Sequence, residues 1–458
     1  MMLGLFWLTL SAGAESFDQM TQGLHPGLNR AWQVHGYHRV RSNGYYNLDL
    51  DRGLTTAGTP IFPVPITGGQ WLSSTDMRFR ADVSGVSERG SVAVNLRFDV
   101  LDNLRLGSLP SGSAIDTTSQ LSPSDSIVVR QAYATALTPL GFVVAGRMST
   151  QWGLGMLVND GTCIDCNTVD ISDRLGFITA LAGHLWAISY DYSAVGTGID
   201  RAYNVPQIDA DPSDDAHSLS IAVMDVLSDF SRERRRKAGR HSFEYGAYYS
   251  TRQQTNDNPY TYLDPDSEVS DILMPRNYQA TATDGWVRVT APTWTIAFEG
   301  AYLTANIGNV SLLPGVSSGD VLTSQQWGLA LESEQQLSET FRWGFNAGMA
   351  SGDEAPGLGG RAQSSFANAQ AGDLDGAQFD FPNDNTVNNF RFHADYRIDR
   401  ILWREIVGTV TDAVYLRPHF SWQIAQAGPG TLTLHQALVY SQAMQPTSTL
   451  SGEPGLGL

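Results

Sequence analysis

The sequence predicts an all-β chain whose strands have one polar and one apolar face. In residues 75–86 (TDMRFRADVSGV), apolar side chains alternate with arginine, aspartate and serine, which is the period of two expected of a half-buried strand. Residues 91–100 (SVAVNLRFDV) repeat this alternation, and the SERG sequence at 87–90 between them is typical of a tight turn. The two segments together predict an antiparallel hairpin.

Thirteen further segments have a similar pattern, and several of them, such as 293–302, have aromatic residues along the apolar row. Residues 388–398 (NNFRFHADYRI) also alternate, but a strand there would disturb the order of the connections, so we place them in a loop. The fifteen predicted strands are 31–41, 75–86, 91–100, 127–137, 141–149, 174–182, 184–192, 216–227, 241–250, 284–290, 293–302, 324–334, 340–349, 412–424 and 431–442.

The connections between these strands alternate between long and short. The long ones include 103–125, 150–173 and 350–411, whereas 138–141 and 427–430 are short and 228–240 is of medium length. Membrane β-barrels produce this alternation because short periplasmic turns face long extracellular loops. A secreted β-rich domain is the competing interpretation, but a soluble sandwich has no reason to sort loop lengths in this way.

Composition supports the membrane interpretation. Only 17% of the 458 residues are charged, against roughly 25% in soluble domains, and 10% are aromatic. No stretch approaches the ~18 apolar residues of a membrane helix. We therefore expect an antiparallel up-and-down transmembrane β-barrel of about 16 to 18 strands, an even number, with C-terminal strands missing from this chain. The barrel would form one domain over 15–458, with an extracellular loop at 350–411.

The N-terminus resembles a secretory signal. The apolar run from Leu3 to Leu10 is followed by Ala12 and Ala14, which fit the small-residue pattern of a cleavage site. The positively charged region that normally precedes such a run is missing. Residues 1–14 are therefore expected to be the remnant of a signal peptide, and the bacterial outer membrane is the expected location.

Three blocks of the sequence carry a resemblance to a known family. Residues 97–110 (RFDVLDNLRLGSLP), 128–161 and 395–418 resemble an uncharacterised family of porin-like outer-membrane β-barrels from myxobacteria, itself distantly similar to alginate-export porins. The resemblance implies a barrel and an envelope location. It carries no functional residue over to this chain.

The stretch GRMSTQWGLGM at 146–156 joins a strand end to a glycine-containing loop. A phosphate-binding loop would need a third glycine and a following helix, and neither is present. We expect a strand end and a pore rim, with Trp152 at the outer membrane interface. The residues expected to face lipid are Phe142, Val144, Gly146 and Met148, and those expected to face the lumen are Val143, Ala145, Arg147 and Ser149.

Charged residues on the polar faces of the strands are the candidate pore lining, because rings of charge set selectivity in wide pores. Arg147 is the first candidate for a constriction, with Arg97 and Arg80 as neighbours. An alternative of equal weight is that these charges pair across neighbouring strands and only fill a solvated interior. The complete set of expected pore-lining residues is Arg147, Arg97, Arg80, Arg78, Asp82, Asp99 and Glu299.

Other features point to structure rather than chemistry. Cys163 and Cys166 lie in an expected extracellular loop, where a local disulfide is the simplest outcome, although the thiols could also stay reduced or bind metal. The acidic segments 48–53 and 209–215 lack the spacing of a calcium loop. The basic run 232–237, which contains the one lysine of the chain, is expected to be a solvated turn in an acidic protein of net charge −18, rather than a nucleic-acid site.

The expected function is that of an outer-membrane channel for small hydrophilic solutes, with an anion bias. Its partners would be outer-membrane lipid, lipopolysaccharide and the solutes; no cofactor, metal or nucleic acid is expected, and the oligomeric state, monomer or trimer, is open. No G-x-S-x-G or H-E-x-x-H motif is present, so no enzyme is expected. Open alternatives are a surface adhesin, a transporter plugged by the 350–411 loop, and a hydrolase with its site at the rim.

Overall fold

A computed structural model describes most of the predicted strands and several of the loops that connect them. The residues that it describes are 32–47, 71–87, 91–106, 127–193, 198–201, 205–209, 212–257, 273–310, 321–353, 385–428 and 430–445. The expected signal remnant at 1–14, the acidic segment at 48–53 and much of the 350–411 loop lie outside the described residues.

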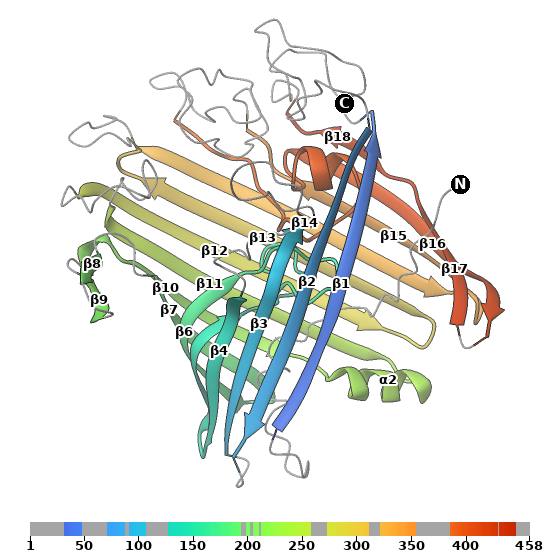
Figure 1. The fold of residues 1–458 in the computed structure, drawn as a ribbon, viewed down its shortest axis with the longest axis horizontal. Helices are drawn as coiled ribbons and strands as arrows, with labels where there is room; N and C mark the ends of the chain where they lie inside the picture. The colour runs from blue at the N-terminus through green and yellow to red at the C-terminus, as the bar shows by residue number, and fades with distance from the viewer. Residues whose placement is uncertain are drawn as a thin grey trace, which may run out of the picture. The chain divides into compact units, whose positions relative to one another are not determined.

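The chain is all-β, and sixteen of its strands form one up-and-down sheet (Figure 1). Neighbouring strands from β1 to β5 and from β7 to β17 pair antiparallel. The path runs in chain order from β1 to β17, except that the β8–β9 hairpin stands apart between β7 and β10 and β18 pairs with β16. The described strands of this path end at β1 and β17 without closing on each other.

The strands are β1 (Trp32–Tyr46), β2 (Trp71–Val86), β3 (Val92–Arg105), β4 (Ile127–Thr138), β5 (Gly141–Ser149), β6 (Ile171–Leu181), β7 (His184–Ser193), β8 (Gly198–Arg201), β9 (Val205–Asp209), β10 (Ala216–Asp225), β11 (Ser242–Asp257), β12 (Met274–Thr290), β13 (Trp294–Ile307), β14 (Leu322–Gln336), β15 (Phe341–Ala350), β16 (Ala413–Ala427), β17 (Gly430–Ala437) and β18 (Tyr440–Ala443). The helical elements are η1 (Pro212–Asp214), α2 (Asp229–Lys237) and η2 (Leu402–Ile406). None of the helices in the described part of the chain combines the length and hydropathy that a bilayer crossing needs.

The predicted strands and the alternation of connection lengths are confirmed. All fifteen segments contain strands, and β5 has the predicted bounds. Strands β11 and β12 are several residues longer than predicted, because their outer parts lose the regular alternation of apolar residues on which the prediction relied. Residues 388–398 form no strand; Arg391 makes only an isolated bridge with Thr411.

Two compact units make up the described chain. The N-terminal unit lies within 16–150 and 160–177, and the C-terminal unit within 151–159 and 178–458. Strands β1 to β5 belong to the first unit and β7 to β18 to the second. The prediction of a single barrel domain over 15–458 stays a prediction.

Both units have sheets whose two faces are inverted relative to a soluble protein. On β13, Ile296, Phe298 and Tyr302 are exposed, while Ala297 and Glu299 between them are buried. Strand β3 has the same order, with an exposed row of valine and leucine opposite the buried Asp99. We call the side that carries Asp99 in one unit and Glu299 in the other the buried face, and its opposite the exposed face. An apolar exposed face requires a nonaqueous surrounding or a partner.

Candidate functional site

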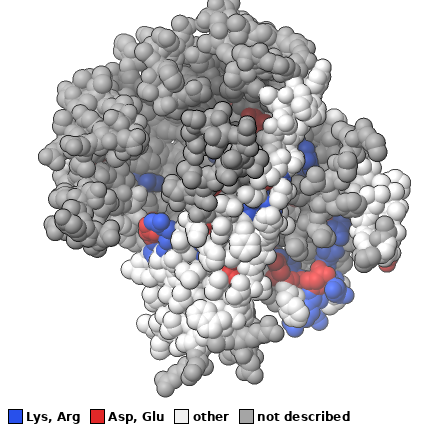
Figure 2. Space-filling view, in the orientation of Figure 1, with Lys and Arg blue, Asp and Glu red and all other residues white. Residues whose placement is uncertain are grey.

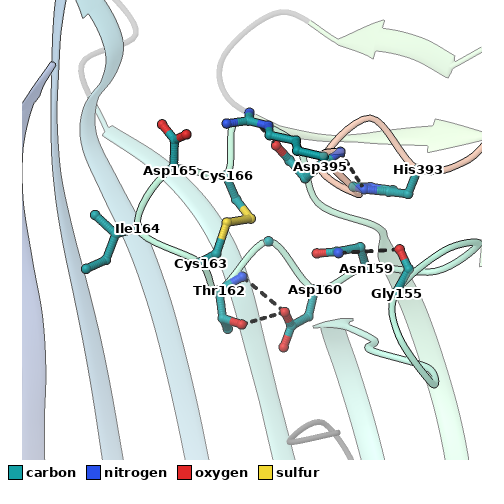
Figure 3. The surroundings of a disulfide bond; sticks show 12 residues. Gly155, Asn159, Asp160, Thr162, Cys163, Ile164, Asp165, Cys166, His393 and Asp395 are labelled. Atoms are coloured by element: carbon teal, nitrogen blue, oxygen red, sulfur yellow. Dashed lines mark hydrogen bonds and ion pairs between the residues drawn. A yellow bond between two sulfur atoms is a disulfide. The ribbon is translucent and has the colours of Figure 1, made fainter. Parts of the chain in front are cut away.

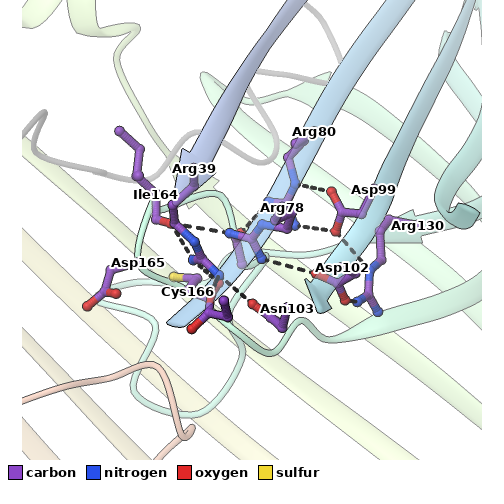
Figure 4. A network of polar contacts seen from close by, with 12 residues as sticks. Arg39, Arg78, Arg80, Asp99, Asp102, Asn103, Arg130, Ile164, Asp165 and Cys166 are labelled. Atoms are coloured by element: carbon purple, nitrogen blue, oxygen red, sulfur yellow. Dashed lines mark hydrogen bonds and ion pairs between the residues drawn. The ribbon is translucent and has the colours of Figure 1, made fainter. Parts of the chain in front are cut away.

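The buried face of the N-terminal unit carries a network of arginine and aspartate side chains (Figure 4). Arg80 on β2 lies directly opposite Asp99 on β3, and its Nε and Nη2 atoms donate to the two carboxylate oxygens at 2.7 and 2.8 Å. Asp99 also accepts from Nε of Arg130 on β4 at 3.1 Å. Asp99 is completely buried, so its carboxylate depends on these two guanidinium groups for compensation.

A second part of the network joins β1 to β2. Asp76 accepts from Nη2 of Arg39 at 3.2 Å and from Nε of Arg41 at 3.0 Å. Arg78 donates to the hydroxyl of Tyr37 at 2.6 Å and lies 3.6 Å from the carboxylate of Asp102. These side chains share the buried face because the residues of β1 and β2 that carry them are spaced by two.

The loop that follows β5 is held against this network by its backbone carbonyls. Gly161 O accepts from Arg80 at 2.7 Å, and Ile164 O accepts from Arg39 at 2.7 Å and from Arg78 at 3.2 Å. A disulfide joins Cys163 to Cys166 and closes the turn that presents Ile164 (Figure 3). These guanidinium N–H groups therefore bind backbone carbonyls of the loop.

Opposite charges nearly balance within the network. Each guanidinium group has at least one carboxylate partner within 4 Å. The alternative that these residues pair across neighbouring strands is thus the arrangement observed, and little net field remains to select ions. The cations are Arg39, Arg41, Arg78, Arg80, Arg97 and Arg130, and the anions are Asp76, Asp82, Asp99, Asp102 and Asp165.

In the C-terminal unit, residues 151–159 lie on the buried face of β11 to β13. The Trp152 indole N–H donates to Asp284 at 2.8 Å, and its ring packs edge-on against Tyr248 with centroids 5.0 Å apart. Glu299 accepts from the backbone N–H groups of Leu154, Met156 and Leu157, the last two at 3.5 and 3.4 Å. The glycine-containing stretch is therefore a cradle for a carboxylate of the protein itself.

Gly153 makes this approach possible. Its backbone has a φ of +52°, and a Cβ atom there would lie 2.5 Å from a Glu299 carboxylate oxygen. Any other residue would be strained by the backbone conformation and would collide with the carboxylate that the loop binds. In the sequence, the lack of a third glycine argued against a phosphate loop, but it gave no sign of this contact with Glu299.

A second segment, residues 388–412, packs on the buried face of β13 to β16. Phe390, Phe392 and Tyr396 form an apolar cluster with side chains of those strands, including Ala330 and Tyr415. The Tyr396 hydroxyl donates to Glu332 at 3.0 Å. This half of the expected extracellular loop therefore occupies space on the buried face instead of extending away from it.

Asp399 shapes the same segment. Its carboxylate accepts from the N–H groups of Leu402 and Trp403 at 2.8 and 3.1 Å, which stabilises the start of η2. Burial raises the pKa of Asp399 above its usual value, against the opposing effect of these donors.

Helix α2 lies at the short-connection end of the C-terminal unit (Figure 1). The Ser228 side chain caps the N-terminus of the helix by accepting a hydrogen bond from the N–H of Ser231. Four consecutive cations occupy the last turn, where they interact favourably with the negative end of the helix dipole. Burial lowers the pKa of Arg232, but hydrogen bonds and charge from Glu244, together with the charge of Asp229, outweigh it and raise the pKa. The sequence predicted only a solvated turn here.

No protein-family model matches this chain, and no curated protein matches it. Similar solved structures are the outer-membrane expressed OmpT of Vibrio cholerae (8% identity, 93% of this chain and 92% of that chain, TM-score 0.39), OmpF of Salmonella typhi in complex with daunomycin (11%, 89% and 89%, 0.39) and an anion-selective porin from Comamonas acidovorans (8%, 90% and 89%, 0.37). With TM-scores below 0.5, none of these similarities assigns a function to this chain.

The prediction for Arg147 is wrong. Val144 on β5 pairs with the fully buried Thr135, whereas Arg147 pairs with Ala132 on the exposed face. Arg147 there binds Asp173 through two hydrogen bonds of 2.8 Å, and both side chains are about half exposed. The error arose because residues 142–149 have apolar side chains on both faces, so the alternation alone does not fix which face is buried.

The same register corrects the neighbouring assignments. Val144 and Met148, expected to face lipid, are buried, and Ala145 lies on the exposed face. Trp152, expected at the outer interface, is buried against Tyr248 and Asp284. The other six candidates lie on the buried face, where their role as a pore lining stays a prediction: Arg97, Arg80, Arg78, Asp82, Asp99 and Glu299.

Several residues of the site were missed from the sequence. Arg39 and Arg41 alternate with Val40 on β1, and this spacing of two was the signal that could have placed them beside the arginines of β2. The contact of Asp165 with Arg41 had no such signal, because it joins a loop to a strand 124 positions away. Within the described residues, no three His, Cys, Asp or Glu side chains are arranged to hold a metal ion.

Proposed function

We propose that this protein is a porin-like channel of the bacterial outer membrane that passes small hydrophilic solutes. The exposed face would contact lipid and the buried face would line the lumen once the sheet closes into a barrel. The resemblance of three sequence blocks to porin-like barrels of myxobacteria and, distantly, to alginate-export porins agrees with this proposal without naming a solute.

The apolar exposed face is the observation that carries the proposal. Strand β7 exposes Trp186, Ile188, Tyr190 and Tyr192 in one row, and neighbouring β10 exposes Leu219 and Ile221. A soluble protein rarely leaves contiguous apolar patches of more than a few hundred Å² in water. In a bilayer the same rows are favourable, and β7 and β10, with 10 residues each, have the roughly 9 to 11 residues that a crossing requires.

The loops on the buried face support a restricted passage rather than a wide one. Residues 151–168 and 388–412 are both held there by specific contacts, such as Gly161 O with Arg80 and the Phe392 ring with that of Tyr415 on β16. A plugged transporter is the second candidate, favoured by the apolar cluster that fixes 388–412. A rim hydrolase finds less support, because the sequence contains neither a G-x-S-x-G nor an H-E-x-x-H motif.

Planar bilayer recording tests the two candidates. We expect the full-length protein to give discrete conductance steps, and replacement of residues 389–410 by a short Gly-Ser linker to enlarge them, because the segment occupies the buried face. Conductance that appears only after this replacement would favour the plugged transporter. Absence of conductance from both proteins, with the folded state verified by heat-dependent migration on a gel, would reject the channel.

A further inference from the structure

Helix α2 concentrates positive charge in an acidic protein. The chain has a net charge of −18, yet the segment 229–240 holds six cations and two carboxylates. Figure 2 shows Lys and Arg gathered at the place that α2 has in Figure 1. The cations are Arg232, Arg234, Arg235, Arg236, Lys237 and Arg240.

Two of these cations fix the helix to the buried-face side of the sheet. Arg232 donates to both carboxylate oxygens of Glu244, at 2.7 and 2.9 Å, and Glu244 is fully buried on β11. Arg236 donates to Pro292 O at 3.2 Å and to the side-chain oxygen of Gln336, the last residue of β14, at 2.9 Å. The helix is therefore anchored to the strand ends from β11 to β14 rather than free in solution.

The remaining cations are exposed. Among the described residues, the side chains of Arg234, Arg235 and Arg240 have no hydrogen-bond or ion-pair partner. Lys237 lies 3.6 Å from Glu233 at an exposed position. These charges differ from the arginines of β1 to β4, whose aspartate partners cancel their field.

The other short connections of the C-terminal unit do not offset this charge. Residues 182–183, 291–293, 337–340 and 428–429 contain one ionisable side chain, that of Glu339. Among these short connections, the excess of positive charge therefore belongs to the segment that contains α2.

We propose that α2 is the charge filter of the channel and favours the passage of small anions. The inference rests on the proposed channel function and adds the class of solute to it. A fixed cluster of cations at the mouth of a pore raises the local concentration of anions and lowers that of cations. Because the cluster is exposed to electrolyte, its effect decreases at high salt, where the Debye length falls to about 3 Å at 1 M.

Reversal potentials in a potassium chloride gradient test the filter. The triple variant Arg234→Gln, Arg235→Gln, Arg240→Gln is expected to lower the chloride-to-potassium permeability ratio by a factor of about two near 0.1 M salt. Without salt, one unit charge at ~10 Å in water changes the local concentration of a monovalent ion about twofold. Screening at 0.1 M salt reduces the effect of each of the three charges. The effect should grow at 0.01 M salt. Arg147→Gln is the control, since it removes an exposed cation that lies outside α2, on the exposed face of the N-terminal unit, and should leave the ratio unchanged.

A second measurement removes a charge from the wild-type channel after it has folded. Lys237 is the one lysine of the chain, so acetylation of channels already in the bilayer removes a single side-chain charge from α2. The ratio should fall slightly in the wild-type channel and stay constant in Lys237→Arg, which controls for acetylation of the terminal amine.

The outcomes separate the filter from the channel itself. A triple variant that conducts normally with an unchanged reversal potential would overturn the role of α2 and leave the channel function intact. Equal shifts for the triple variant and Arg147→Gln would also overturn it, because they would show a nonspecific effect of charge. Failure of the wild-type protein to conduct would overturn the channel function and this inference together.

Discussion

At the scale of single residues, burial decides which charges matter for folding. Asp99 is completely buried and accepts from Arg80 and Arg130, whereas Asp173 is about half exposed and binds only Arg147 among the described residues. A buried carboxylate leaves uncompensated guanidinium groups when it is removed. Asp173 lies near the start of β6, and its removal leaves Arg147 near the end of β5, where the long side chain can extend to water at the membrane interface. The two arginine–aspartate pairs have similar distances, but they contribute differently to the free energy of unfolding.

Asp99→Ala should therefore destabilise the protein by about 3 to 5 kcal/mol. Asp173→Ala is the matched control and should cost about 0 to 1 kcal/mol. Urea unfolding in detergent, followed by tryptophan fluorescence, measures both free energies. Equal losses for the two variants would contradict the importance of burial. The double variant Arg80→Met, Asp99→Leu should recover part of the loss, because it removes the buried charges together.

At the scale of elements, the loop after β5 combines a covalent and a polar anchor. The disulfide between Cys163 and Cys166 closes a tight turn, and the carbonyl oxygens around it accept from Arg39 and Arg78. The disulfide restricts the turn in the unfolded chain, and the arginines hold it in the folded one. Neither anchor alone explains why this loop lies on the buried face.

Replacement of both Cys163 and Cys166 by serine should lower the free energy of unfolding by about 2 kcal/mol, the chain-entropy value for so short a loop. The turn should also become sensitive to proteases, which mass spectrometry of the fragments would locate. Protein isolated without reductant should bind no alkylating reagent at either thiol. Two labelled thiols would show that the disulfide does not form in the cell.

At the scale of the whole molecule, the apolar exposed face predicts which substitutions destabilise the protein in lipid. Phe298 on β13 and Phe230 on α2 are both exposed aromatic side chains. Only the first belongs to an apolar row of a strand, so only the first is expected to contact the bilayer core. If water surrounded both positions, substitutions at Phe298 and Phe230 would have similar effects on stability.

Phe298→Arg should accordingly cost about 2 to 4 kcal/mol of folding free energy in lipid, the range for arginine near the bilayer midplane. Phe230→Arg should cost close to nothing. The folded fraction in lipid vesicles is read from the difference in gel migration before and after heating. Similar tolerance of both substitutions, or a protein that stays soluble without detergent, would reject the membrane barrel.

The sequence by itself determined the strands and their order. Alternation with a period of two is a local property, so it located all fifteen strand segments, and the parity of loop lengths indicated an up-and-down sheet. The pairing of Cys163 with Cys166 was equally local. The charged rows of β2 and β3 could be assigned to one face because their opposite rows are uniformly apolar.

Only the tertiary structure decided the rest, because it depends on register and on contacts distant in sequence. Arg147 was placed on the wrong face because β5 is apolar on both sides, and its pairing with β4 settles the choice. The cradle around Glu299 joins residues more than 140 positions apart, and no local pattern encodes such a contact. Likewise, the run RERRRK specified a cluster of charge, but only its bonds to Glu244 and Gln336 fixed where that charge acts.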